Sequence, residues 1–215
     1  MHTKEFFRNK HYTDIPVASK DRRCTLRASI LSIILCSLLL IGCAGNIVNL
    51  SYPPLQKAAA PGAAKNISVC VVDFANKRQE SAAIGKRLND DPILPRTPVE
   101  RWLATGLALE LENAGYTVIM AETLPAALMR GADYIVAGEV EEVWLAEVSY
   151  TRFTGTIRAS ISLLDGKGDH ITRNAYNSVY SKTILPIYGV PQSLLDEALA
   201  EMLLPAVRLL AKTMQ

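Results

Sequence analysis

Few residues in this chain have the types and spacing that catalysis needs. His170 is the only histidine after Cys43, so a Ser-His-Asp or Cys-His arrangement in that part of the chain would have to use it. It lies beside a hairpin turn, where an exposed turn residue is the simpler interpretation. Gly166 and Gly168 lack the third glycine and the following helix of a dinucleotide-binding motif. We therefore predict no catalytic residues and no bound cofactor.

Metal binding is equally poorly supported. Zinc sites draw mainly on cysteine and histidine, and after Cys43 the chain offers only His170 and Cys70. Cys70 lies in a continuous apolar run, where a cysteine usually acts as a small buried hydrophobic residue. It has no cysteine partner in that part of the chain, so we expect neither a metal site nor a disulfide there.

Basic residues give the best candidate for binding. Lys77, Arg78, Lys86 and Arg87 fall within eleven residues, between an apolar strand and a helix start. They could meet an anionic partner, such as a lipid headgroup, a glycan phosphate or an acidic protein patch. Arg158 belongs to a polar strand face that could contact a partner as well. A solvated loop and a solvent-exposed strand face remain the alternatives.

Acidic residues gather along one predicted strand. Glu139, Glu141, Glu142 and Glu147 could suggest paired catalytic carboxylates. Alternation would place Glu139, Glu141 and possibly Glu147 on the solvent side, where charge discourages edge-to-edge pairing of strands. We expect this solvated role, and a hydrolase that uses His170 or these acids is kept as an alternative.

The elements that would position these residues follow the order β-α-β-α-β-β-β-α. A parallel crossover followed by a meander predicts an α+β fold: a two-layer sandwich with a mixed sheet and helices mainly on one face. Between the first strand and the first helix lies a long polar stretch without clear structure. Strands are expected at 67–74, 116–120, 133–148, 153–164 and 171–183, and helices at 97–115, 124–130 and 191–212.

Local signals refine these elements. Thr97 and Glu100 form a capping box at the start of a helix, and Ser193 with Asp196 offer a second capping pair. The long strand alternates until position 140 and then slips to Trp144, Ala146 and Val148, which predicts a β-bulge near 140–143. In the next strand Thr154, Thr156, Arg158, Ser160 and Ser162 should form a wet face.

The N-terminal segment differs from the rest in composition. Residues 28–42 carry no charge and follow a cluster of basic residues. An uncharged run of fifteen residues is short for a membrane-spanning helix, which needs about 20, and suits a signal peptide. The part after residue 43 has a net charge of −2, with sixteen basic and eighteen acidic residues. A mildly acidic domain is a poor phosphate binder, so we discount nucleic acid as a partner.

The residues Leu40-Ile41-Gly42-Cys43 resemble a bacterial lipobox. The resemblance implies diacylglyceryl attachment to the Cys43 sulfur, cleavage before Cys43 and acylation of the new amino group. It divides the chain into a signal peptide (1–42), a lipidated flexible tether (43–65) and an α/β domain (66–215). The residue after Cys43 is Ala44. An Asp at this position would resemble an inner-membrane retention signal, so its absence favours the periplasmic face of the outer membrane. An uncleaved membrane anchor is the alternative.

The domain itself resembles the YajG-type family of Gram-negative outer-membrane lipoproteins. The matching features include residues 99–103 through 113–118, residues 132–136, the strand at 156–165, and Tyr180 with the terminal helix. These motifs are structural, so the resemblance implies location and fold but no activity. We predict a non-enzymatic, lipid-anchored protein that binds an envelope protein or an anionic envelope component. An accessory subunit of a lipid or solute transporter and an envelope hydrolase are the alternatives.

Overall fold

A mixed β-sheet forms the frame of this protein. The computed structural model describes residues 46–53, 66–183 and 190–214, so the predicted signal peptide and Cys43 lie outside the described residues. The strands are β1 (Ile47–Val48), β2 (Ser68–Val72), β3 (Ala75–Asn76), β4 (Gly85–Lys86), β5 (Pro92–Pro95), β6 (Thr117–Ala121), β7 (Tyr134–Ser149), β8 (Arg152–Asp165) and β9 (His170–Thr183). The helices are α2 (Val99–Asn113), α3 (Leu124–Leu128) and α4 (Gln192–Thr213).

The long strand β7 organises the sheet. Along one edge it pairs antiparallel with β8, which pairs antiparallel with β9. Along its other edge it pairs in turn with β2, β3 and β4, all parallel to it. β2 also pairs parallel with β6, so the chain from β2 through α2 to β6 makes the predicted parallel crossover. β5 pairs antiparallel with β4 and parallel with β1.

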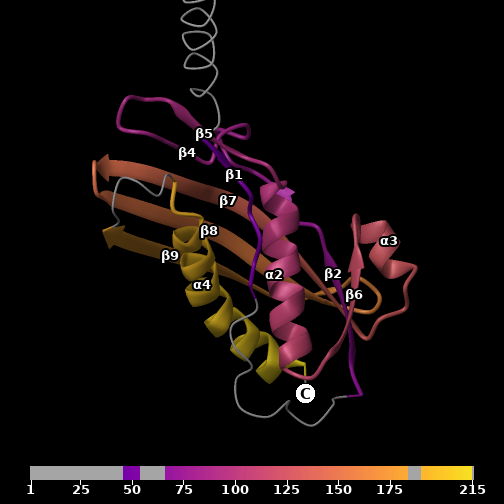
Figure 1. Ribbon diagram of the computed structural model, residues 1–215. Helices are drawn as coiled ribbons and strands as arrows, with labels where there is room; N and C mark the ends of the chain where they lie inside the picture. The colour runs from indigo at the N-terminus through magenta and orange to yellow at the C-terminus, as the bar shows by residue number, and fades with distance from the viewer. Residues whose placement is uncertain (1–45, 54–65, 184–189, 215) are drawn as a thin grey trace, which may run out of the picture. The chain divides into compact units, whose positions relative to one another are not determined.

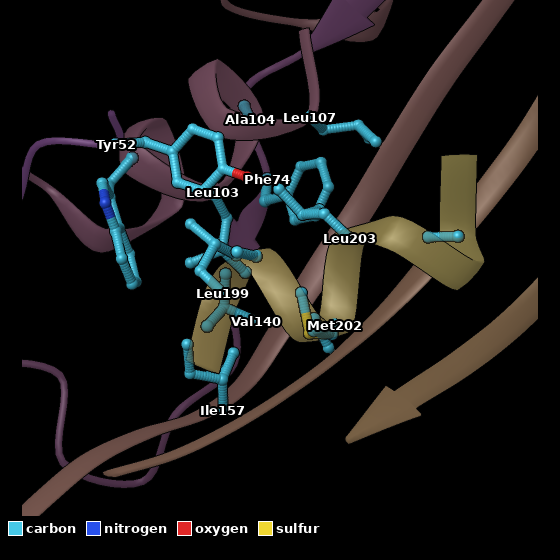
Figure 2. Packing of buried hydrophobic residues seen from close by; sticks show 14 of the residues in the cluster. Tyr52, Phe74, Leu103, Ala104, Leu107, Val140, Ile157, Leu199, Met202 and Leu203 are labelled. Atoms are coloured by element: carbon cyan, nitrogen blue, oxygen red, sulfur yellow. The ribbon is translucent and has the colours of Figure 1, made fainter. Parts of the chain in front are cut away.

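Helices α2 and α4 lie side by side on one face of the sheet (Figure 1). Figure 2 shows Leu103 of α2, Leu199 and Leu203 of α4, and Phe74 meeting in one cluster above Val140 of β7. The short helix α3 belongs to a separate, smaller cluster that includes Cys70 and Ile135. The expected α+β fold with helices mainly on one face is therefore confirmed.

Two glycines let other groups come close to the sheet. A Cβ at Gly138 of β7 would lie 2.5 Å from the ring of Phe74, and a Cβ at Gly155 of β8 would lie 2.2 Å from Leu194 of α4. Any larger side chain at either position would push these groups away. The missing side chains therefore set how closely Phe74 approaches β7 and how closely α4 approaches β8.

The polar stretch between β2 and α2 is structured, which the sequence did not indicate. It forms β3, β4 and β5, and the Ile84 N–H donates to the Ile93 carbonyl at 2.8 Å. The Leu145 N–H of β7 donates to the Ile84 carbonyl at 2.7 Å. Both isoleucines are fully buried. Two buried isoleucines thus anchor short strands within a stretch that is mostly polar.

Part of the predicted tether is also packed onto the domain. Residues 46–53 contain β1, and Val48, Leu50 and Tyr52 are buried. The Tyr52 hydroxyl donates to Glu110 Oε1 of α2 at 2.9 Å. The other residues of the predicted tether, 43–45 and 54–65, lie outside the described residues. The folded domain therefore begins well before residue 66.

The predicted bulge is present, but its consequence for the strand differs from the expectation. The β7–β8 register shifts between Val140 and Glu142, so that Glu141 is the extra residue. After the shift, Val143 and Leu145 are buried, whereas Trp144 is only half-buried. The predicted continuation of the apolar face through Trp144, Ala146 and Val148 was wrong, because the bulge turns the alternate residues toward the helices.

Both predicted helix caps were wrong in detail. α2 begins at Val99 with Pro98 as its N-cap and no side-chain capping bond, and Thr97 Oγ1 contacts Asn49 instead. α4 begins at Gln192 with Pro191 as its N-cap, again without a side-chain capping bond. In both places a proline fixes the entry into the helix. Asp196 therefore lies inside α4 and does not cap it.

Asp196 is poorly accommodated as a charged residue. Its Oδ1 is buried and has no hydrogen-bond partner in the described part of the chain. Burial, with a smaller effect of nearby Glu197, raises the pKa of Asp196 to about 6. The usual value is about 4. The carboxyl is thus easier to ionise in the unfolded chain, and its contribution to stability is lost as the pH rises from about 4 through about 6.

Replacing Asp196 with asparagine should therefore stabilise the protein at pH 8 by about 1–3 kcal/mol, because the variant keeps the shape without the buried charge. At pH 4, where both forms are neutral in the folded state, the two proteins should unfold at similar temperatures. Thermal melting followed by circular dichroism at several pH values measures this difference. A difference that is the same at pH 4 and pH 8 would show that ionisation of Asp196 is not its cause.

Candidate functional site

A pocket of about 420 Å³ opens beside the bulge of β7. It lies between the loop that follows β3 and the face of β7 and β8 that points away from α2 and α4. The bulge contributes Glu141 and Glu142, β7 adds Trp144, and β8 adds Arg158. The complete lining consists of Lys77, Arg78, Gln79, Glu80, Glu141, Glu142, Val143, Trp144 and Arg158.

Acids balance the basic residues in this pocket. Arg158 donates from Nη2 to Glu142 Oε2 at 2.6 Å, and its Nε lies 3.7 Å from Glu141 Oε2. These side chains are between about a third and a half exposed, so water screens the pairs. Together with Lys77, Arg78 and Glu80, the lining carries three positive and three negative charges. The pocket is therefore polar and nearly neutral, and not the cationic site that the sequence alone suggested.

Arg78 has a structural role in the loop. Its side chain is only 9% exposed and donates to the carbonyl oxygens of Ala83 at 2.8 Å and Ser81 at 2.6 Å. It also donates from Nε to Asn76 Oδ1 at 3.1 Å. Burial lowers the pKa of the Arg78 guanidinium from its usual value, which lies far above neutrality. Arg78 thus shapes the wall of the pocket, whereas exposed Lys77 leaves its ammonium without a partner in the described residues.

The other two predicted binding residues lie outside this pocket. Lys86 pairs with Asp90 at 2.8 Å on the surface. Arg87 Nε lies 2.5 Å from Glu147 Oε2, and its guanidinium carbon lies 5.8 Å from the centre of the Phe153 ring. The structure therefore brings Lys77, Arg78 and Arg158 together and separates Lys86 and Arg87 from them.

Glu147 was placed on the wrong face by the simple alternation of β7. Its side chain is 7% exposed and also accepts a hydrogen bond from the Leu88 N–H at 3.2 Å. The bulge at Glu141 changes the parity of the strand and turns Glu147 toward the side of Phe153. The same change of parity turns Trp144 into the pocket. Counting residues from the predicted bulge could have located both side chains.

The polar face of β8 is only partly wet. Arg158 is exposed, but Ser160 and Ser162 are 4% and 8% exposed. Arg173 of β9 crosses this face, donating from Nη2 to Ser160 Oγ at 2.9 Å, and pairs with Glu139 of β7. The expectation of a fully solvated face was wrong at these two serines because a long arginine covers them.

His170 lines a second pocket, of about 320 Å³, together with Ser162, Asp73 and Glu139. This is the only histidine in the described residues, and the pocket contains the residue types of a hydrolase. However, none of the hydrogen bonds among the described residues joins His170 to Ser162 or to either carboxylate, and Glu139 is held by Arg173. The nucleophile–base contact of a catalytic triad is not assembled here.

Metal and thiol chemistry are not organised in the described ranges. Within residues 46–53, 66–183 and 190–214, no group of three or more His, Cys, Asp or Glu side chains could hold a metal ion. Cys70 is a fully buried free cysteine, and burial raises the pKa of its thiol. The thiol thus stays protonated within the small core under α3. No helix among the described residues is both long and apolar enough to cross a bilayer.

Comparison with known proteins finds partial structural likenesses and no sequence match. No family model matches this sequence, and no curated protein sequence matches it. Protein XCC0632 from Xanthomonas campestris is 13% identical with a TM-score of 0.49, covering 78% of this chain and 94% of that one. The PelC dodecamer from Paraburkholderia phytofirmans is 20% identical with a TM-score of 0.42, covering 72% and 93%.

A third similar structure is the lipoprotein GNA1162 from Neisseria meningitidis. It is 14% identical with a TM-score of 0.37, and the alignment covers 68% of this chain and 99% of that one. At these levels of identity the likenesses do not assign the chain to a family.

Proposed function

We propose that this protein is a lipoprotein of the bacterial cell envelope whose folded domain binds a partner and performs no catalysis. The lipobox at residues 40–43, the uncharged segment before it and the basic residues ahead of that segment support the anchor. Ala44 supports the outer membrane as its destination. The resemblance of residues 66–212 to YajG-type lipoproteins supports the same location.

One observation supports binding: three of the five basic residues singled out in the sequence meet at one pocket beside an aromatic ring. Trp144 gives this pocket an apolar surface, while Arg158 and Lys77 provide donors and Glu141 and Glu142 provide acceptors. Tryptophan and arginine are the residue types that contribute most often to binding energy at interfaces. A pocket of balanced charge suits a partner that presents both donors and acceptors.

The partner that we propose is an envelope protein or an anionic envelope component. The exposed ammonium of Lys77 would be available for the first contact with such a partner. A role as accessory lipoprotein of a lipid or solute transport system falls within this proposal. An envelope hydrolase is less well supported because, among the described residues, neither a nucleophile nor an orienting carboxylate forms a hydrogen bond with His170.

Photocross-linking in intact cells tests binding at this pocket. A photoreactive phenylalanine analogue at Trp144 of the full chain should give a discrete adduct of higher mass on illumination. The matched control carries the analogue at Met129, which is 83% exposed and lies next to α3, away from the bulge. Arg158→Glu should reduce the Trp144 adduct about tenfold, since one charge-assisted contact contributes roughly 1.5–3 kcal/mol. Equal yields at positions 144 and 129 would contradict the proposal.

A further inference from the structure

Strand β9 forms a long open margin of the sheet (Figure 1). It pairs with β8 along one edge, and no other strand of the described chain pairs with it. Its register with β8 shifts only near its start, at Leu163 and Leu164, so Thr172–Thr183 is regular. The backbone N–H and C=O groups along its outer edge are therefore arranged to receive another strand.

β9 has few of the features that usually prevent an edge strand from pairing with another strand. Proline, bulges and unpaired charges protect edge strands in many proteins, and β5 contains both Pro92 and Pro95. β9 has no proline. Its regular part contains two basic residues, and both form ion pairs within the chain: Arg173 with Glu139 and Lys182 with Glu197. Val179 is 59% exposed on the same strand. The edge is thus open to pairing and carries apolar surface.

Helix α4 presents a matching exposed stripe beside this edge. The Lys182 ammonium lies 2.6 Å from Glu197 Oε1, and Ser178 Oγ donates to Glu201 Oε2 at 3.3 Å. These two contacts show that α4 runs antiparallel to β9 and flanks it. The exposed residues that continue the stripe are Glu201, Leu204, Pro205, Arg208 and Lys212, with Leu204 44% exposed.

We propose that a second copy of this chain pairs antiparallel with β9, so that the sheet continues across a two-fold axis near Asn177. This register places Val179 opposite Ala175 of the second copy. Arg173 then faces Ser181 of the second copy, so that basic side chains are not brought together. A two-fold contact of this type uses the same surface on both copies and closes as a dimer.

The stripe on α4 is complementary to itself about the same axis. Its midpoint lies between Leu204 and Pro205, about one turn beyond Glu201, which contacts Ser178 next to the axis. In an antiparallel pair of α4 helices, Leu204 meets Pro205 of the second copy. Glu201 meets Arg208 and Glu197 meets Lys212 of the second copy. The acidic residues in the first half of α4 in each copy therefore lie opposite the basic residues in the last half of α4 in the other copy.

The spacing of the two layers agrees with this arrangement. Neighbouring strands lie about 4.8 Å apart, and α4 packs across β8 and β9. If the axis of α4 lies above the gap between those strands, it is about one strand spacing from the two-fold axis. The two α4 helices are then separated by roughly 9–10 Å, which is the usual distance between packed helices. Strand pairing and helix packing can thus form at the same time.

Disulfide cross-linking at the axis tests the dimer. Asn177→Cys in the full chain, oxidised in intact membranes, should give a product of twice the mass of one chain. Met129→Cys is the matched control because Met129 is also exposed but lies next to α3. The unsubstituted chain controls for its own cysteines. Cross-linking at Asn177 no greater than at Met129 would overturn the proposal.

Charge exchange tests the α4 contact independently. Arg208→Glu should raise the dissociation constant of the dimer at least about tenfold, because two symmetric pairs become repulsive. The double variant Glu201→Arg/Arg208→Glu should restore association, with sedimentation of the detergent-purified chain as the measurement. Circular dichroism confirms that each variant is folded. A monomeric unsubstituted chain, or a double variant that dissociates as readily as Arg208→Glu, would overturn the proposal.

Discussion

Replacing Cys43 with alanine is expected to abolish incorporation of radioactive palmitate and to leave an uncleaved precursor. The lipobox resemblance makes the Cys43 sulfur the site of diacylglyceryl attachment and the signal for cleavage. Each buried methylene of an acyl chain contributes about 0.8 kcal/mol to membrane binding, and two or more chains anchor a protein stably. The variant should therefore also lose the acyl chains that would hold the processed domain at the membrane.

Cys36→Ala is the matched control for this experiment. Cys36 lies seven residues before Cys43, inside the uncharged segment predicted to be removed. Its replacement should leave both palmitate incorporation and the size of the processed protein unchanged. Undiminished labelling of Cys43→Ala, or loss of labelling in Cys36→Ala alone, would contradict the assignment of the lipidated residue.

Replacing Gly85 with valine should destabilise the folded domain more than most single substitutions. A Cβ at this position would lie 2.0 Å from the Leu145 carbonyl oxygen, and 2.7 and 2.9 Å from the carbonyl carbon and the nitrogen of the same residue. These are backbone atoms of β7, so no rotamer change can relieve the overlap. β4 would have to separate from β7, which would break the bond from the Leu145 N–H to Ile84 and expose Ile84.

We expect Gly85→Val to reduce the free energy of unfolding by about 2–4 kcal/mol. For a domain of this size, that lowers Tm by about 10 °C. Gly131→Ala is the control, because Gly131 has a positive φ of 65° but no atom within 4 Å of a built Cβ. It should cost only the backbone strain, about 1 kcal/mol. Equal losses in the two variants, measured by thermal melting, would show that close approach of β4 to β7 is not important.

The regular elements of the fold could be predicted because their residues repeat with the period of the structure. Alternation in β8 and helical spacing in α2 and α4 arise from burial of one face, which leaves a direct trace in the sequence. The bulge at Glu141 was predictable as an interruption of alternation. Its effect on the residues that follow was not assigned correctly, because the pattern after it contains both Trp144 and Leu145 as apolar options.

Short strands could not be predicted because their partners lie far away in the sequence. β1 has two residues and pairs with Leu94 and Pro95, and β4 has two residues and pairs with Leu145 and Ala146. A strand of two residues has no periodicity to detect. Its stability comes from hydrogen bonds and burial against distant residues, such as those around Ile84 and Ile93.

The same distinction applies to the candidate site. The cations were identified by type, but proximity along the chain was a poor guide to which of them act together. Arg158 joins Lys77 in the pocket because β8 pairs with β7 at the bulge, whereas Arg87 turns to Glu147. Trp144 was assigned to the core by its hydrophobicity, and only the change of parity at Glu141 reveals it as a pocket residue.

Mass spectrometry of the protein recovered from the separated membrane and aqueous fractions of cells tests the central claim most directly. If the chain is an envelope lipoprotein, its N-terminal peptide begins at residue 43, and the mass of that peptide includes diacylglyceryl on sulfur and an acyl group on nitrogen. A peptide that spans residues 42 and 43 with a free thiol, in protein that stays in the aqueous fraction, would contradict the account.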